Sequence, residues 1–155
     1  MPVFETRSPE ETEQLGARLG AQLTAGDLIT LAGPLGGGKT CFVRGLVYGA
    51  APDCADQVAS PTYALLHQYP GHPPIYHLDC YRLRGADDAR ESGLLDILSG
   101  DGICLVEWPE RIAAELPAER LEIRFDHLTE SCRRISLFPH GRHARALAEQ
   151  LRKTS

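Results

Sequence analysis

The sequence predicts an α/β fold, a single-domain three-layer sandwich with a mostly parallel central sheet and some antiparallel strands. An apolar, β-rich run at 27–32 is followed by a glycine-rich loop and then by apolar residues at helical spacing over 41–48. A second wholly apolar run, Ile103–Val106, is typical of a strand that is buried on both faces, as parallel strands are. Because the 155 residues show no linker and no shift in composition, we expect one domain over 1–155.

The other elements follow from caps, spacing and turn residues. Ser8-Pro9-Glu10-Glu11 indicates a helix start, and leucines spaced by four extend that helix towards Gly26. A turn at 70–74 separates an extended stretch from a return strand at 75–78, which indicates a hairpin. The sequence also predicts a strand at 3–6, a polar turn at 51–58, a helix at 86–98, a short helix at 113–117, strands at 121–125 and 134–138, and a helix at 142–151.

Residues 33–40, GPLGGGKT, match the phosphate-binding loop G-x-x-x-x-G-K-T. Its glycines let several backbone N–H groups point at one phosphate, and the start of the next helix adds partial positive charge. We expect Lys39 to reach the β- and γ-phosphates and the Thr40 hydroxyl to hold Mg²⁺. A flexible glycine-rich turn does not require Lys-Thr at this offset, so the motif favours a P-loop NTPase-like fold.

Two carboxylates follow predicted strands and are candidates for the chemistry of phosphoryl transfer. Glu107 would emerge from the apolar run at a strand end, where open α/β sheets bind ligands, and is the candidate Mg²⁺ ligand. The alternative is a solvated glutamate at the end of a strand. Asp79 ends another short strand and could orient the attacking water, position Mg²⁺ or pair with Arg82.

Four further features each have two interpretations. Ser60-Pro61-Thr62 is either a switch whose hydroxyl senses the γ-phosphate or an ordinary Ser-Pro turn. Trp108, the only tryptophan, either packs in the core or serves partner contact or closure of the site. His77 and His127 are interpreted as strand packing. Transition-state charge could be met by one of several arginines, Arg82, Arg84, Arg133 and Arg134, which the sequence does not distinguish.

Composition excludes several classes of function. The net charge of −5 argues against a protein that grips nucleic acid by itself, so a nucleic-acid role would run through a partner. No apolar run is long enough for a transmembrane helix, and the N-terminus does not resemble a secretory signal. The five cysteines are scattered without a C-x-x-C pair, which favours free thiols in a reducing cytoplasm over a zinc site.

The ordered set of motifs resembles the bacterial TsaE (YjeE) family from Ser8 to about Leu137. The segments that carry the resemblance are 33–40, 42–45 (FVRG), 60–63 (SPTY), 76–83 (YHLDCYRL) and 103–110 (ICLVEWPE). Members are small P-loop ATPases required for the threonylcarbamoyladenosine modification of tRNA at the adenosine following the anticodon. The resemblance implies Mg²⁺ as cofactor, ATP as substrate, and a direct complex with TsaD and TsaB. TsaC would act functionally by making threonylcarbamoyl-adenylate, and tRNA would be reached only through the complex.

The resemblance also assigns residues. Thr40 and Glu107 would serve Mg²⁺, Asp79 would be needed for activity, and Ser60-Pro61-Thr62 would be the nucleotide-sensing switch. The implied ATP-binding residues are Thr12, Gly33, Leu35, Gly36, Gly37, Gly38, Lys39, Thr40, Cys41 and Arg133. The chain departs from the family pattern at Pro34, Gly37, Cys41 and Cys80. None of these departures touches Lys39, Thr40, Asp79 or Glu107, so activity is expected to survive, although Cys41 removes a hydroxyl near the α-phosphate.

Three functions are therefore compared. The first is a Mg²⁺-dependent ATPase, slow in isolation and stimulated by partners, whose hydrolysis resets the tRNA-modifying complex between turnovers. The second is a small-molecule kinase, with Arg82, Arg84 and Arg90 as a lid over the acceptor. The third is a module that binds ATP and signals by closing a switch, with negligible hydrolysis. A GTPase is disfavoured because the chain contains neither N-K-x-D nor D-x-x-G.

Overall fold

The computed structural model describes residues 2–34, 38–57, 66–81, 83, 90 and 93–154. Its helices are α1 Pro9–Gly20, α2 Lys39–Ala50 and α4 Arg142–Lys153, with 3-10 helices η1 Pro52–Gln57, η2 Leu94–Ser99 and η3 Pro109–Glu115. Its strands are β1 Val3–Thr6, β2 Leu28–Ala32, β3 Leu66–Tyr69, β4 Ile75–Asp79, β5 Ile103–Glu107, β6 Arg120–His127 and β7 Arg133–His140.

The strands form one sheet in the order β1-β7-β6-β2-β5-β4-β3. Its centre is parallel, because β2 pairs with β5 and β6, and β4 pairs with β5, all in the same direction. Antiparallel pairs flank this centre, β6-β7-β1 on one side and β4-β3 on the other. The predicted α/β class with a mostly parallel sheet and some antiparallel strands is confirmed.

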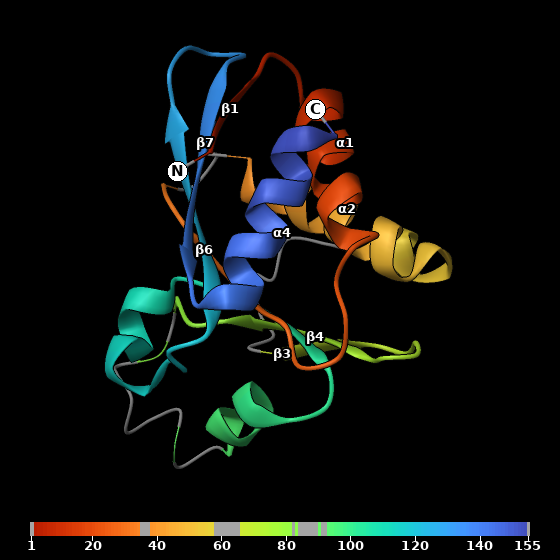
Figure 1. The fold of residues 1–155 in the computed structure, drawn as a ribbon, viewed down its shortest axis with the longest axis vertical. Helices are drawn as coiled ribbons and strands as arrows, with labels where there is room; N and C mark the ends of the chain where they lie inside the picture. Colours follow the sequence, from red (N-terminus) through yellow and green to blue (C-terminus); the bar gives the residue numbers. More distant parts are fainter. Residues whose placement is uncertain are drawn as a thin grey trace.

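The sheet is the middle one of three layers, because helical segments cover both of its faces. Helices α1, α2 and α4 pack on one face, next to β6 and β7 in the view of Figure 1, and bury the larger apolar cluster there. On the other face, residues of η2 and η3 cover β2, β4 and β5 around Leu78, Val106 and Ile112. Both faces of β5 are therefore covered, which explains why all five residues of this strand are buried.

Helices α1 and α2 approach each other at four glycines. A methyl group on Gly16 or Gly20 would lie 2.3 or 2.2 Å from a backbone oxygen of α2, and one on Gly45 or Gly49 would lie 2.0 or 2.2 Å from a backbone oxygen of α1. Real carbon atoms do not approach oxygen so closely, so only glycine permits this separation of the two helices. The contact fixes the start of α1, with Ser8 as its N-cap, relative to the start of α2.

Several predicted elements differ in extent or type. Helix α1 ends at Gly20 instead of reaching Gly26, and a separate turn follows in which the Asp27 carboxylate accepts the Thr24 N–H at 2.7 Å. The predicted turn after α2 is the 3-10 helix η1, whose Cys54 is buried. The predicted helix at 86–98 is 3-10 over Leu94–Ser99, where Gly93 starts it at a φ of 74°; residues 86–89, 91 and 92 lie outside the described part. The short helix predicted at 113–117 begins earlier, at Pro109. The strand, hairpin and C-terminal helix predictions are confirmed within a few residues.

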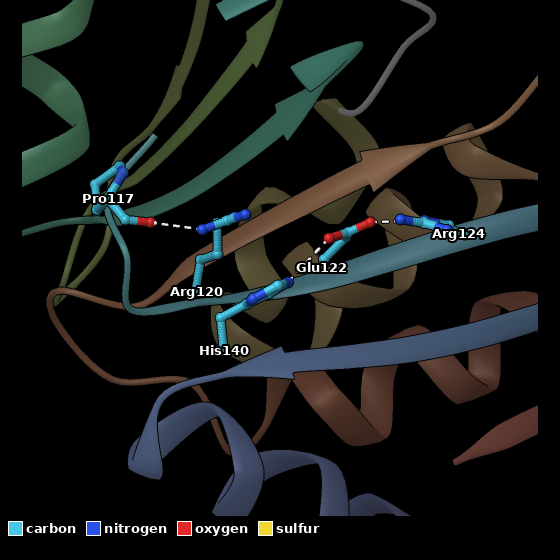
Figure 2. Close-up of polar contacts among 5 residues, drawn as sticks. All are labelled: Pro117, Arg120, Glu122, Arg124 and His140. Atoms are coloured by element: carbon cyan, nitrogen blue, oxygen red, sulfur yellow. Dashed lines mark hydrogen bonds and ion pairs between the residues drawn. The ribbon is translucent and has the colours of Figure 1, made fainter. Parts of the chain in front are cut away.

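Polar side chains join β6 and β7 on the face that the three α-helices leave free. Figure 2 shows Glu122 between His140, whose Nε2 lies 3.0 Å from Oε1, and Arg124, whose Nε donates to Oε2 at 2.6 Å. Burial would raise the pKa of Glu122, but the hydrogen bonds and positive charges of these two partners outweigh it and lower that pKa. The ionised Glu122 carboxylate therefore links β6 to β7.

Within the described ranges, none of the helices combines the length and the apolar character that a bilayer crossing needs.

We predict that Gly45→Ala destabilises the protein. Alanine favours the helix by about 1 kcal/mol, but the added methyl group forces α1 and α2 apart, so we expect a net loss of roughly 2 kcal/mol in the free energy of unfolding by urea. Gly100→Ala is the control, since a methyl group there meets its nearest atom at 3.5 Å. Equal stabilities of the two variants would contradict the close helix contact.

We predict that Glu122 contributes stability only above acidic pH. A carboxylate whose pKa is lowered by folding stabilises the fold above its unfolded pKa of about 4.3, and this contribution is lost as the pH falls through the lower folded value. Glu122→Gln should therefore be less stable than the unaltered chain by about 1 kcal/mol at pH 7. The difference should shrink between pH 4.5 and 3, as measured by urea unfolding at a series of pH values. A difference that stays constant across this range would contradict the prediction.

Candidate nucleotide-binding site

Three parallel strands end at one edge of the sheet. Glu107 pairs with Leu31 of β2 on one side and with Asp79 of β4 on the other. The ladder continues past the ends, because the Trp108 N–H donates to the Leu31 carbonyl at 3.3 Å and the Cys80 N–H donates to the Glu107 carbonyl at 3.0 Å. Helix α2 starts at this same edge, since the phosphate-loop segment leads from β2 into Lys39.

A cavity of about 310 Å³ opens at this edge. Its lining comes from the start of α2, the ends of β4 and β5, the start of α1 and the turn between β6 and β7. The lining residues are Ser8, Pro9, Thr12, Gly38, Lys39, Thr40, Cys41, Asp79, Glu107, Trp108, Glu130, Ser131 and Arg133. Nine of these were predicted as site residues from the sequence, and the fold brings them together from five separate segments.

Lys39 is buried, with 5% of its surface exposed, and two groups hold its ammonium. Nζ donates to the Gly33 carbonyl at 2.7 Å and lies 4.2 Å from the centre of the Trp108 ring. Burial lowers the pKa of Lys39, although the negative charges of Glu107, Glu110 and Asp79 act in the opposite direction. The cation is thus incompletely compensated, and an anionic phosphate would stabilise it.

Trp108 reaches the cavity through an uncommon backbone conformation. Its φ of 56° and ψ of 50° lie in the left-handed region, which turns the chain sharply at the end of β5. The indole packs partly against the apolar cluster under η3, and its ring centre lies 5.0 Å from that of Tyr81. Trp108 therefore both packs against the core and lines the site, as two of the interpretations drawn from the sequence proposed. Its contact with a partner stays a prediction.

The two carboxylates are oriented by hydrogen bonds. Asp79 Oδ1 accepts the Tyr81 N–H at 2.9 Å, and Glu107 Oε2 lies 2.6 Å from His77 Nε2. Burial raises the pKa of Asp79, against the lowering effect of the Tyr81 N–H. His77 was interpreted from the sequence as strand packing, but the structure places it in direct contact with a cavity residue. Its position two residues before Asp79, on the same face of the strand, was the available signal.

Thr12 and Arg133 adjoin the phosphate loop. Gly38 adopts a φ of 97°, and a methyl group built on it would lie 3.5 Å from Thr12 Cγ2 and 3.7 Å from Arg133 Cγ. The Thr12 hydroxyl lies 2.7 Å from the Thr6 hydroxyl, which fixes it from β1. Arg133 Nη1 donates to three carbonyl oxygens of its own turn, those of Thr129, Glu130 and Cys132, at 3.0 to 3.2 Å. The guanidinium is therefore held in place at the cavity wall.

Some predicted residues are not placed and some lining residues were not predicted. Leu35, Gly36, Gly37, Ser60, Pro61 and Thr62, together with Arg82 and Arg84, lie outside the described residues. Gly33 is described, and its carbonyl is the one that holds Lys39. Ser8, Pro9, Glu130 and Ser131 were missed as site residues. Ser8 was recognised as a helix cap, and its hydroxyl accepts the Glu11 N–H at 3.1 Å. The strand-turn residues Glu130 and Ser131 carry no sequence signal for a site.

The residues present fit a magnesium ion that is held jointly with a nucleotide. Among the described residues, no group of three or more His, Cys, Asp or Glu side chains could hold a metal on its own. The cavity instead offers the Thr40 hydroxyl and the carboxylates of Glu107 and Asp79. Mg²⁺ is commonly bound through one or two such protein oxygens together with substrate phosphates and water.

Comparison with known proteins identifies the family. The family "Threonylcarbamoyl adenosine biosynthesis protein TsaE" matches residues 6–135. The chain belongs to the TsaE family. The TsaE of Bacillus subtilis is 36% identical over 149 residues, covering 96% of this chain and 92% of that protein. The TsaE of Treponema pallidum is 37% identical over 132 residues, covering 85% and 96%. The crystal structure of Bacillus subtilis YdiB superposes with a TM-score of 0.80 at 32% identity, covering 99% of this chain and 95% of that one.

The TsaE match includes every segment that lines the cavity. Residues 6–135 include the start of α1, the phosphate loop, the ends of β4 and β5, and Arg133. The resemblance drawn from the motifs of the sequence is therefore confirmed, and the YdiB likeness extends over the C-terminal helix α4 as well.

We predict opposite effects of Lys39→Met on stability and on ligand response. Removing a buried, incompletely compensated ammonium should leave the melting temperature of the nucleotide-free protein equal or higher. The rise in melting temperature that ATP with Mg²⁺ gives the unaltered chain should be absent. Thermal unfolding with and without ligand measures both, and a full ligand-induced rise in the variant would remove Lys39 from the site.

Proposed function

We propose that this chain is a Mg²⁺-dependent ATPase that takes part in the threonylcarbamoyladenosine modification of tRNA. The observation that carries this proposal is that Lys39, Thr40, Asp79 and Glu107 line one cavity at the start of α2. Membership of the TsaE family, whose name refers to this biosynthesis, gives the modification pathway.

Nucleotide binding is supported by the charge arrangement. The triphosphate would lie along the start of α2, where backbone N–H groups and the Lys39 ammonium face it. In doing so it would replace the Gly33 carbonyl as a partner of Nζ, 2.7 Å away in the present structure. Arg133 and Thr12 would flank the nucleotide from the opposite wall.

Hydrolysis would be divided between the two carboxylates. Glu107 and the Thr40 hydroxyl would hold Mg²⁺, which when bound neutralises charge on the β- and γ-phosphate oxygens. Asp79, whose pKa is raised by burial, is suited to orient the attacking water and accept its proton. The Trp108 ring lies 4.2 Å from Lys39 Nζ and would limit the access of bulk water to the ammonium.

The partners follow from the family and from the charge of the chain. We propose a direct complex with TsaD and TsaB, with TsaC supplying threonylcarbamoyl-adenylate, in the cytoplasm. The net charge of −5 suits docking on a partner that itself holds tRNA. Hydrolysis would reset this complex between turnovers and would be slow without it. Ser60-Pro61-Thr62 would be the segment that senses the γ-phosphate.

We predict that Glu107→Gln folds and binds ATP but loses Mg²⁺-dependent hydrolysis by at least about 100-fold, because an amide is a poor ligand for the metal. The measurement is phosphate release by the purified chain, alone and with TsaB and TsaD. The matched control is Glu122→Gln on the other face of the sheet, which should hydrolyse ATP at the unaltered rate. Unaltered hydrolysis by Glu107→Gln would reassign the metal site.

The pathway role is tested by reconstitution of tRNA modification with TsaB, TsaC and TsaD, with and without this chain, over many turnovers. We expect modification to stop after about one turnover per complex when the chain is omitted or carries Glu107→Gln. Equal yields with and without the chain would refute the role. ATP consumption that yields a phosphorylated metabolite would support the kinase, and tight ATP binding without phosphate release would support the non-hydrolysing module.

A further inference from the structure

A buried histidine lies behind the candidate metal ligand. His77 Nε2 is 2.6 Å from Glu107 Oε2, and the two side chains are 1% and 6% exposed. Among the described residues, His77 is the only group that forms a hydrogen bond with this carboxylate. Glu107 itself lines the cavity, whereas His77 does not. The imidazole thus contacts Oε2 of a carboxylate whose side chain also lines the cavity.

The surroundings of the ring determine which nitrogen carries hydrogen. His77 Nδ1 is buried and has no hydrogen-bond partner among the described residues. A hydrogen on Nδ1 would be buried without an acceptor, whereas a hydrogen on Nε2 is accepted by Glu107. Of the two neutral tautomers, the arrangement therefore favours the one in which Nε2 donates to Glu107.

The ring cannot readily turn away from Glu107. His77 belongs to β4 and pairs with Leu105 of β5, two positions before the Asp79–Glu107 pair. The His67 ring of β3 lies beside it, with ring centres 6.1 Å apart. The donor is therefore fixed by the sheet, and a fixed donor restricts the rotamers of the carboxylate it holds.

We propose that His77 is a positioning residue that fixes the Glu107 carboxylate so that Oε1 faces Mg²⁺ bound with ATP. This inference rests on the function proposed above. Its consequence is a selective one: His77 contributes to the part of ATP affinity that depends on Mg²⁺, and it makes no contribution to ATP binding without the metal.

The test compares two substitutions of His77 by amide side chains that differ only in length. In His77→Gln the side-chain nitrogen can take the place of Nε2 and still donate to Glu107, whereas in His77→Asn it corresponds to Nδ1 and falls short. ATP affinity is measured calorimetrically with Mg²⁺ and with EDTA. We expect His77→Asn to lose about tenfold or more of the Mg²⁺-dependent gain in affinity, and His77→Gln to keep most of it. Binding in EDTA should be unchanged in both.

Two controls separate this role from a loss of stability. His143→Asn makes the same substitution at another histidine–carboxylate pair, where Nε2 lies 2.7 Å from Asp27 Oδ1, and it should leave the Mg²⁺-dependent gain unchanged. In a Glu107→Gln background, His77→Asn should cause no further loss of that gain, because its target is already removed. A further loss in that background would overturn the proposal.

A measurement on the unaltered chain does not depend on the variants folding. Nitrogen NMR of the His77 ring should show hydrogen on Nε2, and the Nε2 signal should shift when Mg²⁺ is added to the ATP complex. Absence of hydrogen on Nε2, or a full Mg²⁺-dependent gain in His77→Asn, would overturn the positioning role while leaving the ATPase proposal intact. Failure of the unaltered chain to bind ATP with Mg²⁺ would instead overturn the proposed function and this inference with it.

Discussion

The parallel register of β2, β5 and β4 is the constraint on which the site depends. Because Glu107 pairs with Leu31 on one side and Asp79 on the other, the ends of three strands lie in one row. The ladder extends beyond the row through the N–H groups of Cys80 and Trp108, so the backbone that carries the carboxylates is fixed on both sides. A shift of one residue in either pair would turn a carboxylate from one face of the sheet to the other.

The charges at this edge do not fully compensate one another within the protein. Lys39 is buried near Glu107, Glu110 and Asp79, yet its ammonium bonds to the Gly33 carbonyl and lies over the Trp108 ring. Neither neutral group replaces the hydration that burial removes, and the left-handed conformation of Trp108 adds strain at the same place. A triphosphate would compensate the Lys39 ammonium, and its metal ion would compensate the carboxylates. Such a ligand would explain why a folded protein retains this arrangement.

The sequence predicted those parts of the molecule that local chemistry determines. The loop GPLGGGKT, the apolar run before Glu107 and the cap at Ser8 each indicate a structure within a few residues. Where a residue's role depends on distant segments, the sequence was insufficient. The predicted turn after α2 is a 3-10 helix with Cys54 buried, and the contact between His77 and Glu107, which are 30 positions apart, depends on the pairing of β4 with β5. Thr12 was reached only through the family resemblance, and Arg133 was one of four candidate arginines until that resemblance selected it.

The glycines of α1 and α2 explain how the start of α1 reaches the phosphate loop. Gly16 and Gly20 face the backbone of α2, and Gly45 and Gly49 face that of α1, so the helices meet backbone to backbone. A larger separation would move Thr12 away from Gly38, where an added methyl group would lie 3.5 Å from Thr12 Cγ2, and would widen the cavity on the side opposite the carboxylates. The wall at Thr12 is thus set by helix packing, while the wall at Asp79 and Glu107 is set by strand register. The two walls can therefore be altered separately, and a glycine substitution that parts the helices should weaken nucleotide contacts without displacing Asp79 or Glu107.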